Sequence, residues 1–345
     1  WVIKYLVEYF RGNAKLLAED GYFTDFISNG VSTELCFVAF CAFTLIIIFA
    51  GVQNGIERVS KIMMPILIVL SVIIAVYSVT RPGALAGVKY FLVPNVKNFS
   101  WMTVVSAMGQ MFYSLSIAMG ILITFGSYMK KDTAIEDSTR NVEIFDTGIA
   151  IMAGLMIIPA VFAFSGGDPD TLQAGPSLMF ITIPKVFQNM GFGTVIGIVF
   201  FLLVLFAAVT SSIALTESAV STFEDELGWG RKKATVLVGV IMLALGSLSS
   251  LGYGPLAGIK IIGMQFLDLF DFLTNSVMMP IAALLTSLLV SRVVGIDKIE
   301  EEIIHGESAF RRKKVFVVMI KYLCPVFAII ILLSSVANAL GWIKM

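Results

Sequence analysis

The sequence has 345 residues, 58% of them hydrophobic, and its 24 Lys and Arg residues balance its 24 Asp and Glu residues. This apolar share and a mean hydropathy of +0.92 exclude an ordinary soluble domain and indicate a polytopic protein of the lipid bilayer. The balanced charge offers no broad field for polyanions, so we expect no nucleic-acid partner.

Eight apolar segments follow a helical remnant at residues 1–10, and a helix needs about 20 such residues to cross a bilayer. They are residues 34–52, 61–79, 101–129, a segment ending at 164, and residues 192–227, 235–251, 265–294 and 315–342. The polar segments 11–33, 53–60 and 295–314 predict loops, with 53–60 a hairpin connection between antiparallel spans. Residues 81–100 predict an interfacial connection.

A long loop is predicted at residues 166–191, yet it contains the apolar run LMFI at 178–181. We expect this run to pack down over the helices as a plug. Basic residues concentrate in one set of alternate loops, which by the positive-inside bias is cytoplasmic and places loop 166–191 outside. The cytoplasmic set includes Arg58, Lys61, Lys130, Lys131, Arg140, Arg231, Lys232, Lys233, Arg292, Lys298 and residues 311–314.

The segment GQMFYSLSIAMG at residues 109–120 lies within an apolar span but carries glycines and serines. Gly109 and Gly120 weaken a helix, and serine side chains compete for its backbone groups, so a break between them is one interpretation. A broken membrane helix would offer carbonyls to a cation and N–H groups to an anion. The alternative is a continuous helix whose serines bond to their own turn.

Two further polar features lie within apolar spans. Asp146, about a dozen residues into its helix, needs a partner such as a cation; alternatively it joins two helices as a protonated or hydrogen-bonded acid. The run AAVTSS at residues 207–212 could supply hydroxyl and carbonyl oxygens to a monovalent cation, or could simply hold helices together.

Enzymatic readings are disfavoured. His305 is the only histidine and lies in a charged cytoplasmic loop, which removes an intramembrane Ser–His pair and a zinc motif. The cysteines, at positions 36, 41 and 324, have neither disulfide nor metal spacing, and we expect no cofactor. An ion channel would need rings of like polar residues, whereas the polar residues here form a single cluster.

Nearly the whole chain resembles the bacterial branch of the neurotransmitter:sodium symporters. The resemblance rests on GQMFYSLS at 109–116 with Gly120, SYMKKD at 127–132, IPAVFAF at 158–164, AAVTSS at 207–212 and FEDE at 223–226. It implies an all-α, polytopic inverted-repeat transporter fold with broken helices. On this alignment Trp1 falls in the second half of the third helix, so the chain is expected to lack the first two to three helices.

The same resemblance implies four regions. Residues 1–80 would be the remnant of the first repeat, with the end of helix 3 and helices 4 and 5, and residues 81–100 an extracellular connection. Residues 101–294 would be the second repeat, helices 6 to 10 with the extracellular plug loop 166–191. Residues 295–345 would form a cytoplasmic loop and helix 11.

Carried over by position, the resemblance also implies site residues. The first sodium site would use Ser114 and Asp146, and the second would use Ala207 through its carbonyl, Thr210 and Ser211. Substrate-binding positions would be Tyr113, Ser114, Ser116, Met119, Ser211 and Leu215. Gates would involve Gln110 and Asp271 outside, and Tyr128 and Asp225 inside.

Departures from the family pattern refine this expectation. Asp146 stands where Asn is frequent, which places a fixed negative charge at the first sodium site and predicts chloride-independent transport. Ala118 replaces a usual Gly, and Met119 a frequent Phe, in a pocket that otherwise looks apolar. A neutral, hydrophobic amino acid is therefore the expected substrate.

The sequence thus predicts a sodium-coupled amino-acid symporter that works by alternating access, with sodium ions as coupling ions, in the bacterial cytoplasmic (inner) membrane. The alternative hypothesis is a truncated, non-transporting membrane fragment or a partner subunit. An in-frame, glycine-rich broken helix encoded upstream of Trp1 would distinguish the first from the second.

Overall fold

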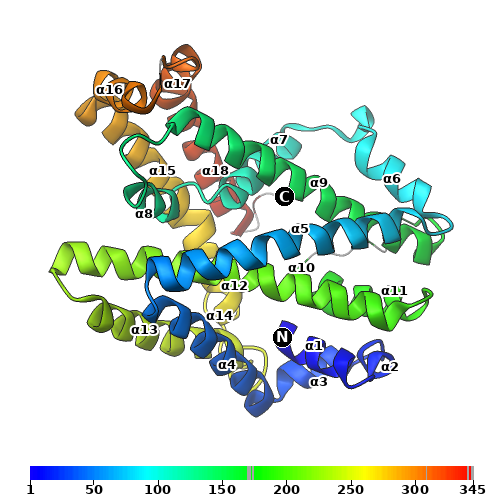
Figure 1. Cartoon of the computed structure of the whole chain (residues 1–345). Helices are drawn as coiled ribbons and strands as arrows, with labels where there is room; N and C mark the ends of the chain where they lie inside the picture. The colour runs from blue at the N-terminus through cyan, green and yellow to red at the C-terminus, as the bar shows by residue number, and fades with distance from the viewer. Residues whose placement is uncertain (169–171, 173–174, 308, 340–341, 343–345) are drawn as a thin grey trace. The chain divides into compact units, whose positions relative to one another are not determined.

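The computed structural model describes residues 1–168, 172, 175–307, 309–339 and 342, and within these residues the chain is almost entirely helical (Figure 1). The only pairing of extended backbone in this part is one isolated bridge between Ile261 and Met264. The protein is thus an all-α fold, as expected. Residues 169–171 and 173–174 of the predicted plug loop and 340–341 of the predicted last span lie outside the described residues.

The chain divides into two compact units, residues 1–95 with 148–267 and residues 96–147 with 268–345, so one border falls inside helix α9. Unit 1 contains α1 (Val2–Phe10), α2 (Ala14–Leu17), α3 (Tyr22–Ser28), α4 (Gly30–Phe49), the π-helical segment η1 (Val52–Glu57), α5 (Arg58–Val79), α6 (Ala84–Leu92), the second half of α9 (Ile135–Ser165), α10 (Gly175–Ser177), η4 (Leu178–Thr182), α11 (Ile183–Gln188), α12 (Gly193–Leu227) and α13 (Arg231–Leu251).

Unit 2 begins with the short 3₁₀ turn η2 and ends near the last residues of the chain. It contains η2 (Val96–Asn98), α7 (Trp101–Ser114), α8 (Ile121–Ser127), the first half of α9, most of α14 (Phe266–Asp271), η5 (Phe272–Met278), α15 (Met279–Leu288), η6 (Leu289–Val294), α16 (Ile296–Gly306), α17 (Lys313–Val318), η7 (Met319–Leu323) and α18 (Cys324–Ala339). In this unit α15 packs against α18, and α18 packs against α7.

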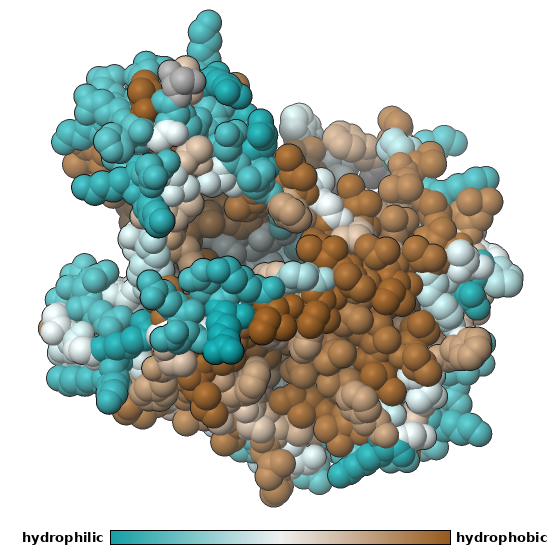
Figure 2. Space-filling view, viewed as in Figure 1, coloured by the Kyte–Doolittle hydropathy of each residue, from teal (hydrophilic) through white to brown (hydrophobic). Residues whose placement is uncertain are grey.

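Seven stretches of helix among the described residues are long and apolar enough to cross a membrane. They are residues 30–49, 52–79, 135–165, 193–227, 231–251, 266–294 and 313–339. The predicted span at 101–129 is not among them, because the chain there is divided between α7 and α8. Figure 2 shows apolar side chains over a broad continuous area, as expected for helices that face lipid.

Four predicted loops contain helix, and one of them, residues 166–191, contains α10, η4 and α11. Residues 53–60 are not a hairpin loop: the chain turns at Ala50 and Gly51, and the next helix has already begun at Val52. Gly51 has φ of 86°, and a Cβ at Gly55 would lie 2.2 Å from the carbonyl oxygen of Ile47, so glycines allow this tight return. The polar residues 53–60 therefore form the first turns of a helix and not a loop.

The other two corrections concern the segments 11–33 and 295–314. The first contains α2 and α3, and α4 already begins at Gly30, capped by the Asn29 side chain, which accepts a hydrogen bond of 3.1 Å from the Ser32 N–H. The second contains α16, an amphipathic helix whose Ile303 is buried. Short amphipathic helices in charged segments are easily mistaken for loops.

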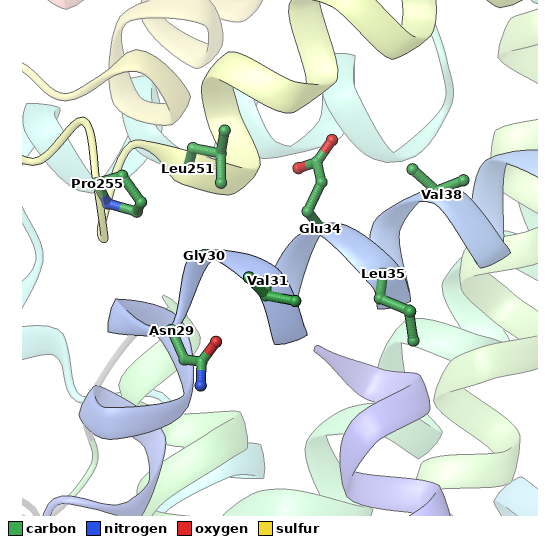
Figure 3. Close-up of a pocket in the computed structure, with 8 residues that line it drawn as sticks. All are labelled: Asn29, Gly30, Val31, Glu34, Leu35, Val38, Leu251 and Pro255. Atoms are coloured by element: carbon green, nitrogen blue, oxygen red, sulfur yellow. The ribbon is translucent and has the colours of Figure 1, made fainter.

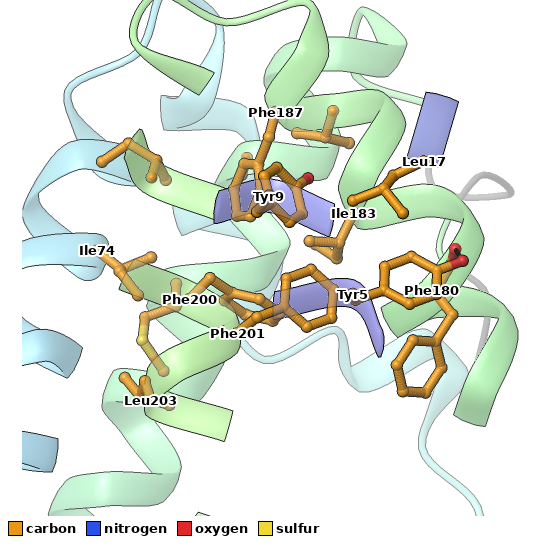
Figure 4. Close-up of a cluster of buried hydrophobic side chains, with 14 of the residues drawn as sticks. Tyr5, Tyr9, Leu17, Ile74, Phe180, Ile183, Phe187, Phe200, Phe201 and Leu203 are labelled. Atoms are coloured by element: carbon orange, nitrogen blue, oxygen red, sulfur yellow. Dashed lines mark hydrogen bonds between the residues drawn. The ribbon is translucent and has the colours of Figure 1, made fainter. Parts of the chain in front are cut away.

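The core of unit 1 is an aromatic cluster around α1 and α12 (Figure 4). Phe180 of η4 is 5% exposed and stacks on Phe23, with ring centroids 5.1 Å apart. The buried Tyr5 hydroxyl donates a 2.7 Å hydrogen bond to the Phe180 carbonyl. The apolar run at 178–181 is thus held against α1 by packing and by a buried hydrogen bond.

Candidate functional site

The interruption between α7 and α8 is built by left-handed backbone. Ser116, Ala118 and Gly120 have φ of 53°, 62° and 79°. Alternating left-handed residues cannot continue a right-handed helix, so α7 ends at Ser114 and α8 starts only at Ile121, after Gly120. Non-glycine residues in this region are strained, and such strain concentrates at functional sites.

The backbone hydrogen bonds at the break differ from a helical ladder. The Ile117 N–H donates to the Phe112 carbonyl at 3.0 Å, and the Met119 N–H donates to the Ser116 carbonyl at 3.4 Å instead of to Leu115. Among the described residues, only the Ser114 carbonyl of the last four in α7 accepts no backbone hydrogen bond, and the first three N–H groups of α8 have no backbone partner. Such ends attract a cation and an anionic group respectively.

Ser114 and Asp146, the two residues predicted for the first sodium site, are in direct contact. The Ser114 hydroxyl donates a 2.6 Å hydrogen bond to Asp146 Oδ1, which joins the last residue of α7 to the twelfth residue of α9. Both lie in unit 2, and Asp146 is partly buried. A carboxylate, a hydroxyl and nearby backbone carbonyls that accept no helical hydrogen bond form a set of hard oxygen donors that suits sodium.

The predicted substrate residues of unit 2 surround the same break. Tyr113 is 53% exposed at the end of α7, and Ser116 lies inside the interruption. Met119 packs against the small apolar cluster of Phe112, Met279 and Ile331. The break thus combines an apolar contact at Met119 with the polar Ser114–Asp146 pair.

A pocket of about 310 Å³ lies between α7, η5, α15 and α18 within unit 2. Gln110 and Asp271, the two predicted outer-gate residues, both line it. Asn275 donates a 2.6 Å hydrogen bond from Nδ2 to Asp271 Oδ1. Asn275 and Ser335 also line this pocket but were not predicted; the position of Asn275, one helical turn after Asp271, was the available signal.

The second predicted sodium site lies on α12 in unit 1. The Thr210 hydroxyl donates to the carbonyls of Phe206 and Ala207, both at 3.0 Å, while Ser211 is exposed. Leu215, one turn further on, is 50% exposed. The helix is continuous here, and the Thr210 hydroxyl bonds to its own turn, so a cation would compete with it for the Ala207 carbonyl. Ser212 in the same run instead contacts the Thr44 hydroxyl of α4 at 3.1 Å.

The predicted inner-gate residues fall in different units, Tyr128 in unit 2 and Asp225 in unit 1. Tyr128 directly follows α8 and is 40% exposed, and Asp225 lies exposed in the last turns of α12. Each remains a prediction as a gate residue.

The sequence analysis missed a buried ion pair between α12 and the start of α13. Arg231, the first residue of α13, binds both carboxylate oxygens of Glu217 at 3.0 and 2.6 Å. The same guanidinium donates to the carbonyl of Ile48 near the end of α4 at 3.0 and 2.9 Å. Glu217 is fully buried, so this fork ties α4, α12 and α13 together. An acid inside an apolar span was the missed signal.

Comparisons with known proteins agree with this architecture. The family model described as "Sodium:neurotransmitter symporter family" matches residues 4–342. A Bacillus subtilis protein described as the uncharacterized sodium-dependent transporter YhdH is 33% identical over 97% of this chain and 74% of its own length. A Haemophilus influenzae protein with a similar description is 30% identical over the same shares.

Among solved structures, the crystal structure of MhsT in complex with L-phenylalanine superposes with a TM-score of 0.84. The two sequences are 33% identical, and the match covers 97% of this chain and 76% of that one.

Proposed function

Because the chain belongs to the sodium:neurotransmitter symporter family and is a multi-pass, sodium-dependent membrane transporter, we propose that it carries a neutral, hydrophobic amino acid by alternating access without chloride. The Ser114–Asp146 hydrogen bond at the interrupted helix is the observation that carries this proposal. It joins a carboxylate to the broken backbone in the same unit, so that sodium and substrate groups would bind side by side.

Three features support an amino-acid substrate. The N–H groups at the start of α8 suit a carboxylate, and the carbonyls at the end of α7 suit a sodium ion or an ammonium group. Met119 and its apolar neighbours suit an uncharged side chain. The solved relative MhsT was crystallised with L-phenylalanine. Large apolar amino acids are therefore the first substrates to test.

Chloride independence is proposed from charge. Asp146 contributes a fixed negative charge beside Ser114, where a neutral Asn would leave the sodium ion without an adjacent carboxylate. A neighbouring carboxylate stabilises a bound cation. A mobile anion would then be unnecessary at this site.

The test is uptake into proteoliposomes containing the purified protein. We expect an inward sodium gradient to drive accumulation of phenylalanine or leucine, and potassium in place of sodium to abolish it. Replacement of chloride by gluconate should leave the rate unchanged. Sodium-independent uptake would contradict the coupling, and loss of uptake in gluconate would contradict chloride independence.

A further inference from the structure

A separate pocket of about 290 Å³ lies in unit 1, where the end of α1, the start of α2, the end of α11 and the start of α12 meet. Polar and apolar groups both line it. They include Tyr9, Lys15, Gln188, Phe192, Thr194 and Val195. None of these residues belongs to the predicted sodium or substrate sites.

The first turn of α12 supplies uncapped backbone donors to this pocket. Its N-cap residue, Phe192, has φ of 59° and makes no side-chain cap. The N–H groups of Gly193 and Ile196 bond to carbonyls of the preceding turn, whereas in the described residues those of Thr194 and Val195 have no backbone partner. The start of a 35-residue helix therefore presents two free donors and a partial positive charge.

Tyr9 provides an independent observation. Its side chain is 2% exposed, stacks on Phe201 with centroids 5.4 Å apart, and lies over Gly197, where a Cβ would be 2.1 Å from its ring. Tyr9 and Phe187, both labelled in Figure 4, line this pocket. In the part of the chain that the structure describes, the Tyr9 hydroxyl makes no hydrogen bond, and its oxygen is not fully enclosed although the rest of the side chain is buried, so the oxygen is accessible at the pocket. Tyr9 thus lines the pocket with a hydroxyl that has no hydrogen-bond partner among the described residues.

Lys15 adds a full positive charge at the same pocket. It makes no ion pair within the described residues, in contrast to Lys185 of α11, which is paired with Asp20. A free ammonium, a phenol and two helix N–H groups form a set of donors that suits an anionic oxygen group.

The apolar wall indicates what carries that anion. Phe192 is 82% exposed and Val195 is 56% exposed, and both lie where the membrane span of α12 begins. The end of a membrane span lies at the level of the lipid headgroups. We propose that this pocket binds the headgroup phosphate of an anionic phospholipid, with an acyl chain lying along Phe192 and Val195. On the predicted orientation this lipid belongs to the outer leaflet.

The test is lipid retention by the purified full chain in nanodiscs containing equal phosphatidylglycerol and phosphatidylcholine, followed by native mass spectrometry. We expect preferential retention of phosphatidylglycerol. Lys15→Gln should lower the retained amount about fivefold, as expected for one lysine at an anionic surface. Tyr9→Phe, which removes only the hydroxyl, should lower it about threefold.

The matched control is Lys89→Gln, which removes an exposed lysine of α6 outside the pocket and should change nothing. Equal melting temperatures for all variants would exclude misfolding as the cause. Equal loss in Lys15→Gln and Lys89→Gln, or equal retention of both lipids, would overturn the proposal. Binding of glycerol phosphate as tight as that of the lipid would overturn the acyl chain's role and indicate a free-anion site.

Discussion

The interrupted helix of unit 2 and the continuous helix α12 of unit 1 carry the two predicted sodium sites, and they offer oxygen atoms differently. At the interruption, the backbone leaves its ladder and Ser114 reaches across to Asp146. On α12, Thr210 returns its hydroxyl to the carbonyls of its own turn. The predicted first site would thus use the side-chain oxygens of Ser114 and Asp146 beside the Ser114 carbonyl, which accepts no backbone hydrogen bond in the described residues. The predicted second site would share carbonyls that already accept from Thr210.

The largest expected effect tests how rigidly α12 is held. Arg231→Met removes the guanidinium that binds both oxygens of the buried Glu217, and breaking such a pair costs about 3 kcal/mol of unfolding free energy. We expect a clear fall in melting temperature in detergent. Lys232→Met, an exposed neighbour, is the control and should melt like the parent. If Arg231→Met lowers the melting temperature no more than Lys232→Met does, the Arg231–Glu217 pair does not hold α12 in place.

The next effect tests the interruption itself. Asp146→Asn removes the carboxylate from the Ser114 contact and should weaken sodium activation of uptake by at least about tenfold, because charge dominates the affinity of oxygen sites for cations. We also expect chloride to stimulate this variant. Ser106→Ala on the exposed part of α7 controls for changes in the helix. If the sodium dependence of uptake is unchanged, Asp146 does not contribute to sodium binding.

A smaller effect tests the left-handed backbone. Gly120→Ala places a Cβ at φ of 79° and should cost about 1–2 kcal/mol, with slower uptake. Gly126→Ala, in the helical part of α8 with open space around it, should be neutral or slightly stabilising. Ala118→Gly should relieve strain at φ of 62°. Thermal melting gives all three values, and equal effects of the two alanine variants would contradict the strained break.

The smallest effect concerns α12. Thr210→Val removes one hydroxyl and should weaken sodium activation only about fivefold, the equivalent of about 1 kcal/mol. Thr222→Val, whose hydroxyl bonds to the Ser218 carbonyl on the same helix, should leave it unchanged. The measurement is uptake against sodium concentration. A larger effect at Thr210 than at Asp146 would contradict the proposal that the first site contributes more than the second to sodium activation of uptake.

The sequence pattern predicted much of the fold and of the candidate site. Long apolar runs predicted the spans because a bilayer demands about 20 apolar residues. Glycines and serines within one run left a break as one of two interpretations, and the ordered motifs, which include those around Ser114 and Thr210, predicted membership of the family. The resemblance implies Gly at position 118, and the left-handed φ of Ala118 gives that expectation a physical reason.

Only the tertiary structure decided where the break falls, which acid meets which hydroxyl, and how buried charges are paired. Ser114 and Asp146 are 32 positions apart, and Arg231 meets the carbonyl of Ile48 across 183 positions. Local sequence determines whether a segment can be a helix and whether it prefers lipid. Contacts between distant segments depend on how helices pack, because rotating a helix by one residue, about 100°, brings a different side chain to the interface.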